Sequence, residues 1–284
     1  LEFRRVLFRS QYTRYVDLGR SFAVWNVFAA PALSLEPKTW CYPVLGCLAY
    51  RGYFSEAEAQ AYADSLSAEG LDSYVGGVAA YSTLGWTSDP VLNTFVYRSE
   101  ARLAELIFHE LAHQLLFVSD DTVFNESFAT AVAREGVRRW MRRHHDPMAY
   151  DAFRRRSMQR EAFVGLVDSL REKLQHLYAG DEAEGTKRRR KVQLIDELRL
   201  AYAELEQTWS GESPFREWVN APMNNAKLNS VAAYNDLVPA LQVLLAQSDN
   251  LDDFYRRCRE LGELAVAERH DQLNRLDRKS TRLN

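Results

Sequence analysis

Cysteine is scarce in this chain, with three residues among 284. Three cysteines are too few to hold a small core together by disulfides, so a disulfide-stapled scaffold is excluded. Cys41 and Cys47 flank a five-residue turn and would pair if the protein is exported; in a reducing compartment they would be two small buried apolar residues. Cys258 lies in a helical pattern with charged neighbours, and we expect it to be unpaired.

The sequence also lacks long apolar runs and an excess of either charge. No stretch approaches the roughly 20 apolar residues of a membrane-spanning helix. The 36 basic and 39 acidic residues give a net charge of −3, which offers no general reason to expect nucleic acid as a partner. Because hydrophobic residues make up 46% of the chain, there is ample material for a packed core, and disorder is excluded.

Both ends of the chain lack helix caps and a clear hydrophobic period. Residues 1–10 and 278–284 resemble non-native sequence, and we leave them out of the fold prediction. We expect one domain over residues 11–273, with a small-sheet and active-site part at about 11–140 and a helical part at about 141–273. The natural protein is expected to begin further upstream, where an export signal would lie.

Local signals predict an α+β fold that is mostly helical. Residues 11–53 indicate irregular packing with a short strand. Ser55 and Glu58 form a capping box that opens a helix, and Gly70 ends it. Residues 71–97 form the best strand region. Apolar residues at helical spacing predict helices over about 99–116, 124–140, 163–178, 192–209, 228–244 and 252–273. The sheet is expected next to the 99–116 helix, and the 163–178 and 192–209 helices are expected to form a long hairpin in the C-terminal half.

The pentad His109-Glu110-Leu-Ala-His113 carries the clearest chemistry. Two histidines four residues apart lie on one face of a helix, so both imidazoles can bind one cation. Glu110 projects about 100° away from His109. It is therefore free to act as a general base toward a water on the metal.

A third metal ligand is expected from a carboxylate that follows the pentad. Glu126 lies at the start of the next predicted helix, and a loop of this length can bring that helix back beside the first. Glu126 could instead be an ordinary acidic residue favoured at a helix N-terminus, and Asp120 or Asp121 could ligate in its place. Two nitrogens and a carboxylate suit one zinc ion, although cobalt or manganese would also be accepted.

Several motifs in register resemble the gluzincins, and more narrowly a family of predicted bacterial aminopeptidases. They are Tyr50–Phe54, Ala80–Trp86, Asp89–Leu92, His109–Gln114 and Phe124–Ala129, and the resemblance covers roughly residues 11–273. It implies zinc, hydrolysis of peptide bonds and a lipoprotein-type location in the bacterial envelope. The chain departs from the gluzincin pattern at Thr130, where many members have an Asp that orients a zinc histidine.

Two further groups of site residues are predicted. Gly77, Tyr81, Ser82 and Gly85 lie in a segment that could bind an extended substrate as a sheet edge, or could be a plain core strand. Tyr234 is the first choice for a donor to the oxyanion of the tetrahedral intermediate, the alternative being an ordinary core or surface tyrosine.

The predicted function is therefore zinc-dependent hydrolysis of peptides, as an aminopeptidase or as an endopeptidase with the same mechanism. A zinc-stabilised helical protein that binds a partner without catalysis is the main alternative, and a scaffold in which the pentad is accidental is a weaker one.

The expected partner is a peptide substrate and not nucleic acid. We expect the periplasm or cell envelope, with peripheral or lipid-anchored membrane association through the missing N-terminus; the cytoplasm is the alternative. Residues 187–191 are basic and are expected on a solvated face; an anionic lipid contact is a further option.

Overall fold

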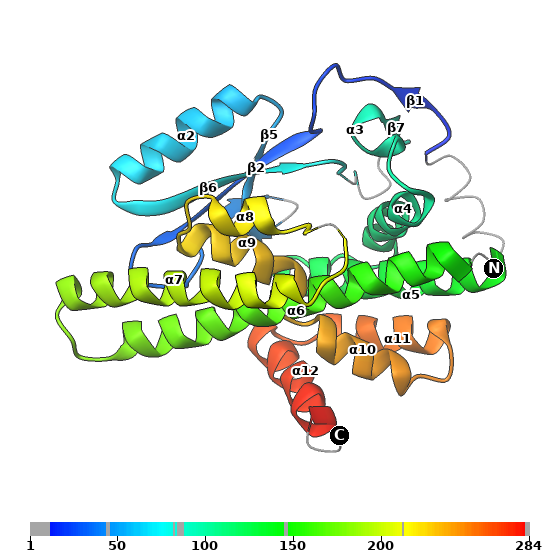
Figure 1. Ribbon diagram of the computed structural model, residues 1–284. Coiled ribbons are helices and arrows are strands. Elements are labelled where there is room, and N and C mark those ends of the chain that lie inside the picture. Colours follow the sequence, from blue (N-terminus) through cyan, green and yellow to red (C-terminus); the bar gives the residue numbers. More distant parts are fainter. Residues whose placement is uncertain are drawn as a thin grey trace.

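The computed structural model describes residues 12–43, 46–81, 83, 88–144, 147–211 and 213–281. Its class is α+β and mostly helical, with sheets of two or three strands, as the sequence predicts (Figure 1). The strands are β1 (Tyr15–Val16), β2 (Val24–Pro31), β3 (Trp40–Tyr42), β4 (Gly46–Leu48), β5 (Arg51–Tyr53), β6 (Leu71–Val78) and β7 (Val91–Leu92). The helices are α2 (Glu56–Ala68), α3 (Asn93–Val96), α4 (Glu100–Leu115), α5 (Thr122–His144), α6 (Pro147–Ala179), α7 (Glu184–Gln207), α8 (Arg216–Asn220), α9 (Asn225–Asn235), α10 (Val238–Ala246), α11 (Leu251–Gly262) and α12 (Val266–Thr281).

The main sheet is antiparallel, with strand order β5-β2-β6. The prediction of irregular packing over residues 11–53 understated this region, because β2 is the eight-residue central strand of the sheet. Six of its residues, from Trp25 to Ala30, are buried. A strand buried on both faces shows no apolar–polar alternation, which explains why sequence patterning missed it.

Helix α2 covers one face of this sheet (Figure 1). The amide of Glu58 donates to Ser55 Oγ at 3.3 Å, which confirms the predicted cap. Gly70 follows the helix with φ +87°, a conformation that glycine adopts without strain. Ala59, Ala63 and Leu66 pack on β2 residues Trp25, Val27 and Ala29. The opposite face of the sheet is left for α9 and the functional site.

The long hairpin expected in the C-terminal half consists of α6 and α7, which lie side by side (Figure 1). Part of the basic segment at residues 187–191 is structural. Lys187 Nζ donates to the carbonyls of Tyr178 and Gly180 at the end of α6, and Lys191 Nζ pairs with Asp72 Oδ2 at 2.6 Å. These two lysines fasten the hairpin to itself and to the sheet.

The helix expected over residues 228–244 is in fact two helices, α9 and α10. Pro239, at the start of α10, is disfavoured in a helix interior and tolerated in the first turn. A buried cluster made by α5 and α10–α12 underlies the site from the side away from the sheet. Among the described residues, no helix has the length and apolar character needed to cross a membrane.

Candidate metal centre

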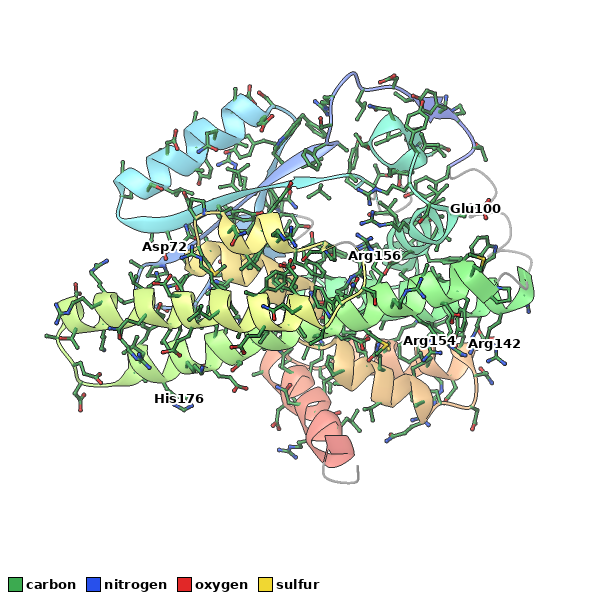
Figure 2. All side chains as sticks on the ribbon, in the orientation of Figure 1. Asp72, Glu100, Arg142, Arg154, Arg156 and His176 are labelled. Carbon is green, nitrogen blue, oxygen red and sulfur yellow. A yellow bond between two sulfur atoms is a disulfide. The ribbon has the colours of Figure 1, made fainter. Side chains whose placement is uncertain are left out.

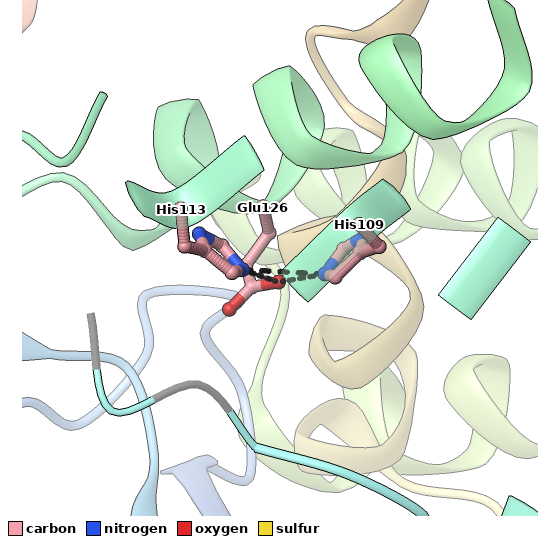
Figure 3. Close-up of side chains that lie close together, drawn as sticks. All are labelled: His109, His113 and Glu126. Atoms are coloured by element: carbon pink, nitrogen blue, oxygen red, sulfur yellow. Dashed lines mark hydrogen bonds and ion pairs between the residues drawn. The ribbon is translucent and has the colours of Figure 1, made fainter. Parts of the chain in front are cut away.

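Three side chains from two helices, His109 and His113 of α4 and Glu126 of α5, converge on one point (Figure 3). His109 and His113 lie one turn apart on α4, and their Nε2 atoms are 3.3 Å apart. Glu126, from the first turns of α5, places Oε2 at 3.2 Å from His109 Nε2 and at 3.7 Å from His113 Nε2. The structure therefore brings together the three residues that were predicted from the sequence as metal ligands.

The spacing of these atoms fits a single small cation. Zinc–ligand bonds of about 2.0–2.1 Å at tetrahedral angles place neighbouring ligand atoms roughly 3.3 Å apart. The three separations around His109, His113 and Glu126 run from 3.2 to 3.7 Å. Two imidazole nitrogens and a carboxylate oxygen could thus hold one metal ion, whose identity the donor set alone leaves open.

Local interactions bring Glu126 to the histidines. The side chain of Asn125 bonds to both the amide and the carbonyl of Val118, at 2.8 and 2.7 Å. These bonds close the loop between α4 and α5. Asp121 caps α5, because its Oδ1 accepts from the amide of Phe124 at 2.9 Å. The second helix then runs back along the first with Glu126 facing inward.

The alternative ligands Asp120 and Asp121 are engaged elsewhere. Asp120 Oδ1 accepts from the amide of Cys47 at 2.7 Å, in the β3–β4 hairpin. The carboxylate of Asp121 is bound by Arg269 and His270 of α12. Of the three candidate carboxylates, Glu126 is the one that approaches the histidines.

The charges of the site depend on its burial. Burial raises the pKa of Glu126, but the nearby histidines outweigh it and lower that pKa to about 2. Burial alone would lower the pKa of His113, yet Glu126 and Glu110 raise it. Glu110 is 7% exposed, and burial raises its pKa despite the opposing effect of the two histidines. A buried carboxylate with a raised pKa is a better proton acceptor than an exposed one.

Two tyrosines lie next to the three candidate ligands. The ring of Tyr234, on α9, lies 6.4 Å from the ring of His109. Burial, with the charges of Glu126 and Glu110 and the nearby Tyr50, raises its pKa well above the usual range, so the phenol keeps its proton. Tyr50, just before β5, donates to Glu126 Oε1 at 3.5 Å. No role was predicted for Tyr50, because its 76-residue separation from Glu126 leaves no spacing signal.

A cavity of about 510 Å³ opens beside the cluster. It is lined by α4 with His109 and Glu110, by Gly77 and its neighbours on β6, and by Tyr234 on α9. One side of β6 pairs with β2, and no strand of the described residues pairs with its other side. The unpaired backbone groups of an edge strand are available to an extended peptide.

The predicted substrate-binding residues are distributed unevenly. A Cβ at Gly77 would overlap the ring of Phe22, so this glycine is also needed for close packing. Tyr81 is 42% exposed and stacks edge-on against Phe54 outside the cavity lining. Ser82 and Gly85 lie outside the described residues.

Among the described residues, His113 has no partner that would fix the tautomer of its imidazole. Thr130 is 9% exposed and lines the cavity. His113 Nδ1 is buried, and no hydrogen bond from a described residue reaches it. Thr130 stands where many gluzincins have an Asp that orients a zinc histidine, and no other described side chain takes over that hydrogen bond to His113.

Comparison with known proteins gives one finding. The model of a family described as "Putative aminopeptidase" matches residues 7–273. Neither a curated protein nor a solved structure matches the chain.

Proposed function

We propose that this chain, which belongs to the family described as "Putative aminopeptidase", is a zinc-dependent aminopeptidase of the gluzincin type. Membership of the family indicates a peptidase. The metal, the mechanism and the catalytic residues are our proposal. One observation carries it: the ligand atoms of His109, His113 and Glu126 converge at separations that suit one tetrahedral ion.

The remaining residues have roles that follow from their chemistry. Bound zinc would lower the pKa of a water to about 7 and polarise the substrate carbonyl. Glu110 would accept a proton from the attacking water and pass it to the leaving amine. Its burial beside His109 supports this role, because the raised pKa of Glu110 strengthens it as a base.

Two features that line the cavity would contribute to catalysis and to substrate binding. The phenol of Tyr234 remains protonated and borders the cavity next to His109, so it would donate a hydrogen bond to the oxyanion of the tetrahedral intermediate. The free edge of β6 would bind the substrate backbone in extended form.

We also propose a location in the bacterial envelope or periplasm. A disulfide joins Cys41 and Cys47 across β3 and β4. Disulfides form and persist in oxidising compartments, which supports export. Fractionation of cells that produce the natural protein would test this, and recovery in the cytoplasm with free thiols would contradict it.

The test of the function combines metal content with hydrolysis. Mass spectrometry should find about one zinc per chain in the wild type and none in Glu126→Ala. Glu110→Gln should keep the zinc and lose hydrolysis of a mixed peptide pool. Glu100→Gln, on the exposed first turn of α4, is the matched control and should keep both.

The products decide the direction of cleavage. An aminopeptidase releases single N-terminal residues and does not cleave N-acetylated peptides, whereas an endopeptidase cleaves both kinds internally. A folded wild type that binds no zinc, or a Glu110→Gln variant with full activity, would refute the proposed mechanism.

A further inference from the structure

Three arginines from different segments line the cavity: Arg98 precedes α4, Arg102 lies on α4, and Arg160 lies on α6. Arg98, Arg102 and Arg160 line the cavity together with Glu105. Arg102, Glu105 and His109 follow one another at intervals of three and four residues, so they lie along one face of the helix. The cavity therefore runs from the candidate metal centre to a cluster of guanidinium groups.

Of these three arginines, one is neutralised within the cluster. Arg160 donates to both carboxylate oxygens of Glu105, at 2.7 and 3.3 Å. Burial raises the pKa of Glu105, but Arg160 outweighs it and the carboxylate stays ionised. The pair is thus neutral as a unit, and Glu105 is not free to bind a cation such as an amine.

The other two arginines are only partly compensated, because the charge of Glu105, which Arg160 binds, also favours the charged form of Arg98. The guanidinium groups of Arg98 and Arg102 make no hydrogen bond or ion pair with any described residue. Burial and the neighbouring charge of Arg102 lower the pKa of Arg98, so the two groups are close enough to repel each other. Both side chains are exposed to solvent, and two neighbouring like charges that line a cavity are stabilised when an anion binds between or beside them.

A second cavity extends this positive lining outward. It encloses about 590 Å³ and shares Arg102, Glu105 and Arg160 with the first. It adds Arg155 and Arg156 from α6. Figure 2 shows Arg156 on the side of α6 that faces α4, whereas Arg154 points to the opposite side.

From these contacts we infer that Arg98 and Arg102 bind a carboxylate of the peptide substrate, so that the enzyme prefers acidic peptides. This inference rests on the proposed function, because it assigns a substrate class to the same site. Arg102 lies seven residues before His109, or roughly 10 Å along the helix. An extended peptide advances about 3.3 Å per residue. The bound carboxylate therefore lies within about three residues of the cleaved bond, as an Asp or Glu side chain or as the C-terminus of a short peptide.

The test is a glutamate scan. A neutral pentapeptide receives one Glu at each position in turn, and each peptide is compared with its Gln counterpart in kcat/KM. At one position within three residues of the cleaved bond, the Glu peptide should have a kcat/KM about tenfold higher than that of the Gln peptide. One good charge-assisted hydrogen bond accounts for a difference of this size. Comparing free-acid with amidated C-termini separates a terminal carboxylate from a side chain.

Substitutions of Arg98 and Arg102 test whether these arginines cause the preference for acidic peptides. Arg98→Gln and Arg102→Gln together should bring the ratio of kcat/KM for the Glu peptide to kcat/KM for its Gln counterpart down to about one. Arg188→Gln removes an exposed arginine that is paired with Glu184 on α7 and should leave this ratio unchanged. The wild-type ratio should also shrink at high salt, because exposed charge pairs are screened.

Binding is measured separately, by fluorescence anisotropy of the labelled peptides on Glu110→Gln protein. Absence of all hydrolysis by the wild type would count against the proposed function, while tighter binding of carboxylate peptides would still support the arginine site. Equal binding and equal hydrolysis of the Glu and Gln peptides, and of the acid and amide forms, would overturn the inference.

Discussion

Asp121→Asn is expected to destabilise the protein strongly at neutral pH. Arg269, on α12, is 2% exposed, and its guanidinium binds the carboxylate of Asp121. His270 Nε2 lies 2.9 Å from the same carboxylate. Asparagine preserves the shape of the side chain and removes only the charge, so the buried guanidinium would lose its counter-ion.

The expected loss is about 3 kcal/mol of the free energy of unfolding. Removing the charge of one partner in a buried ion pair costs roughly 3–5 kcal/mol. The lower end applies because Arg269 also donates to the carbonyls of Leu261, Gly262 and Leu264, which remain. The asparagine side chain of the variant can still accept from the amide of Phe124, so the helix cap itself need not be lost.

The pH dependence identifies the charge as the cause. Burial raises the pKa of Asp121, but hydrogen bonds from His270, the Phe124 amide and Arg269 outweigh it, and the pKa lies below its ordinary value. A lowered carboxyl pKa stabilises the fold above the unfolded-state value of about 3.9, and this stabilisation is lost as pH falls through the folded-state pKa. The difference between variant and wild type in the free energy of unfolding should shrink as the pH falls below about 4.

Urea unfolding at several pH values measures this difference. Asp196→Asn is the matched control, because Asp196 pairs with Arg199 on the exposed side of α7 and should cost less than about 1 kcal/mol. A loss for Asp121→Asn no larger than that of the control, or one that does not change down to pH 3, would refute the reasoning.

Three other predictions concern the site and its helices. Tyr234→Phe should lower kcat about a hundredfold with KM nearly unchanged, because one oxyanion donor is removed; an unchanged kcat would exclude this role. Tyr50→Phe should weaken zinc binding about tenfold in competition with a chelator, because the third ligand loses its hydrogen bond; equal affinity would contradict it. Gly136→Ala should lower the melting temperature, because the new Cβ would lie 2.8 Å from the Phe108 ring between α5 and α4, and overpacking of about 1–3 kcal/mol exceeds the helix-propensity gain of about 0.5–1. Gly165→Ala, with open space around it on α6, should raise the melting temperature, and the opposite order of the two variants would show the packing argument to be wrong.

The sequence by itself determined the features that depend on near neighbours. His109 and His113 share a face because four residues make about one helical turn, and the cap at Ser55 depends on an amide three residues away. The carboxylate Glu126 was within reach of prediction because the connecting loop is short. The same local patterns indicated the α6–α7 hairpin and a mostly helical fold.

Tertiary structure alone decided what depends on distant parts of the chain. Tyr50 meets Glu126 across 76 residues, and His270 meets Asp121 across 149; no periodicity marks such pairs. The central position of β2 could not be inferred either, because a strand buried on both faces lacks alternation. Arg98 and Arg102 are exposed side chains, and only the packing of α4, α6 and β6 makes them line the same cavity as the candidate metal centre. Such contacts arise from how whole elements pack, which the spacing of residues along one element does not specify.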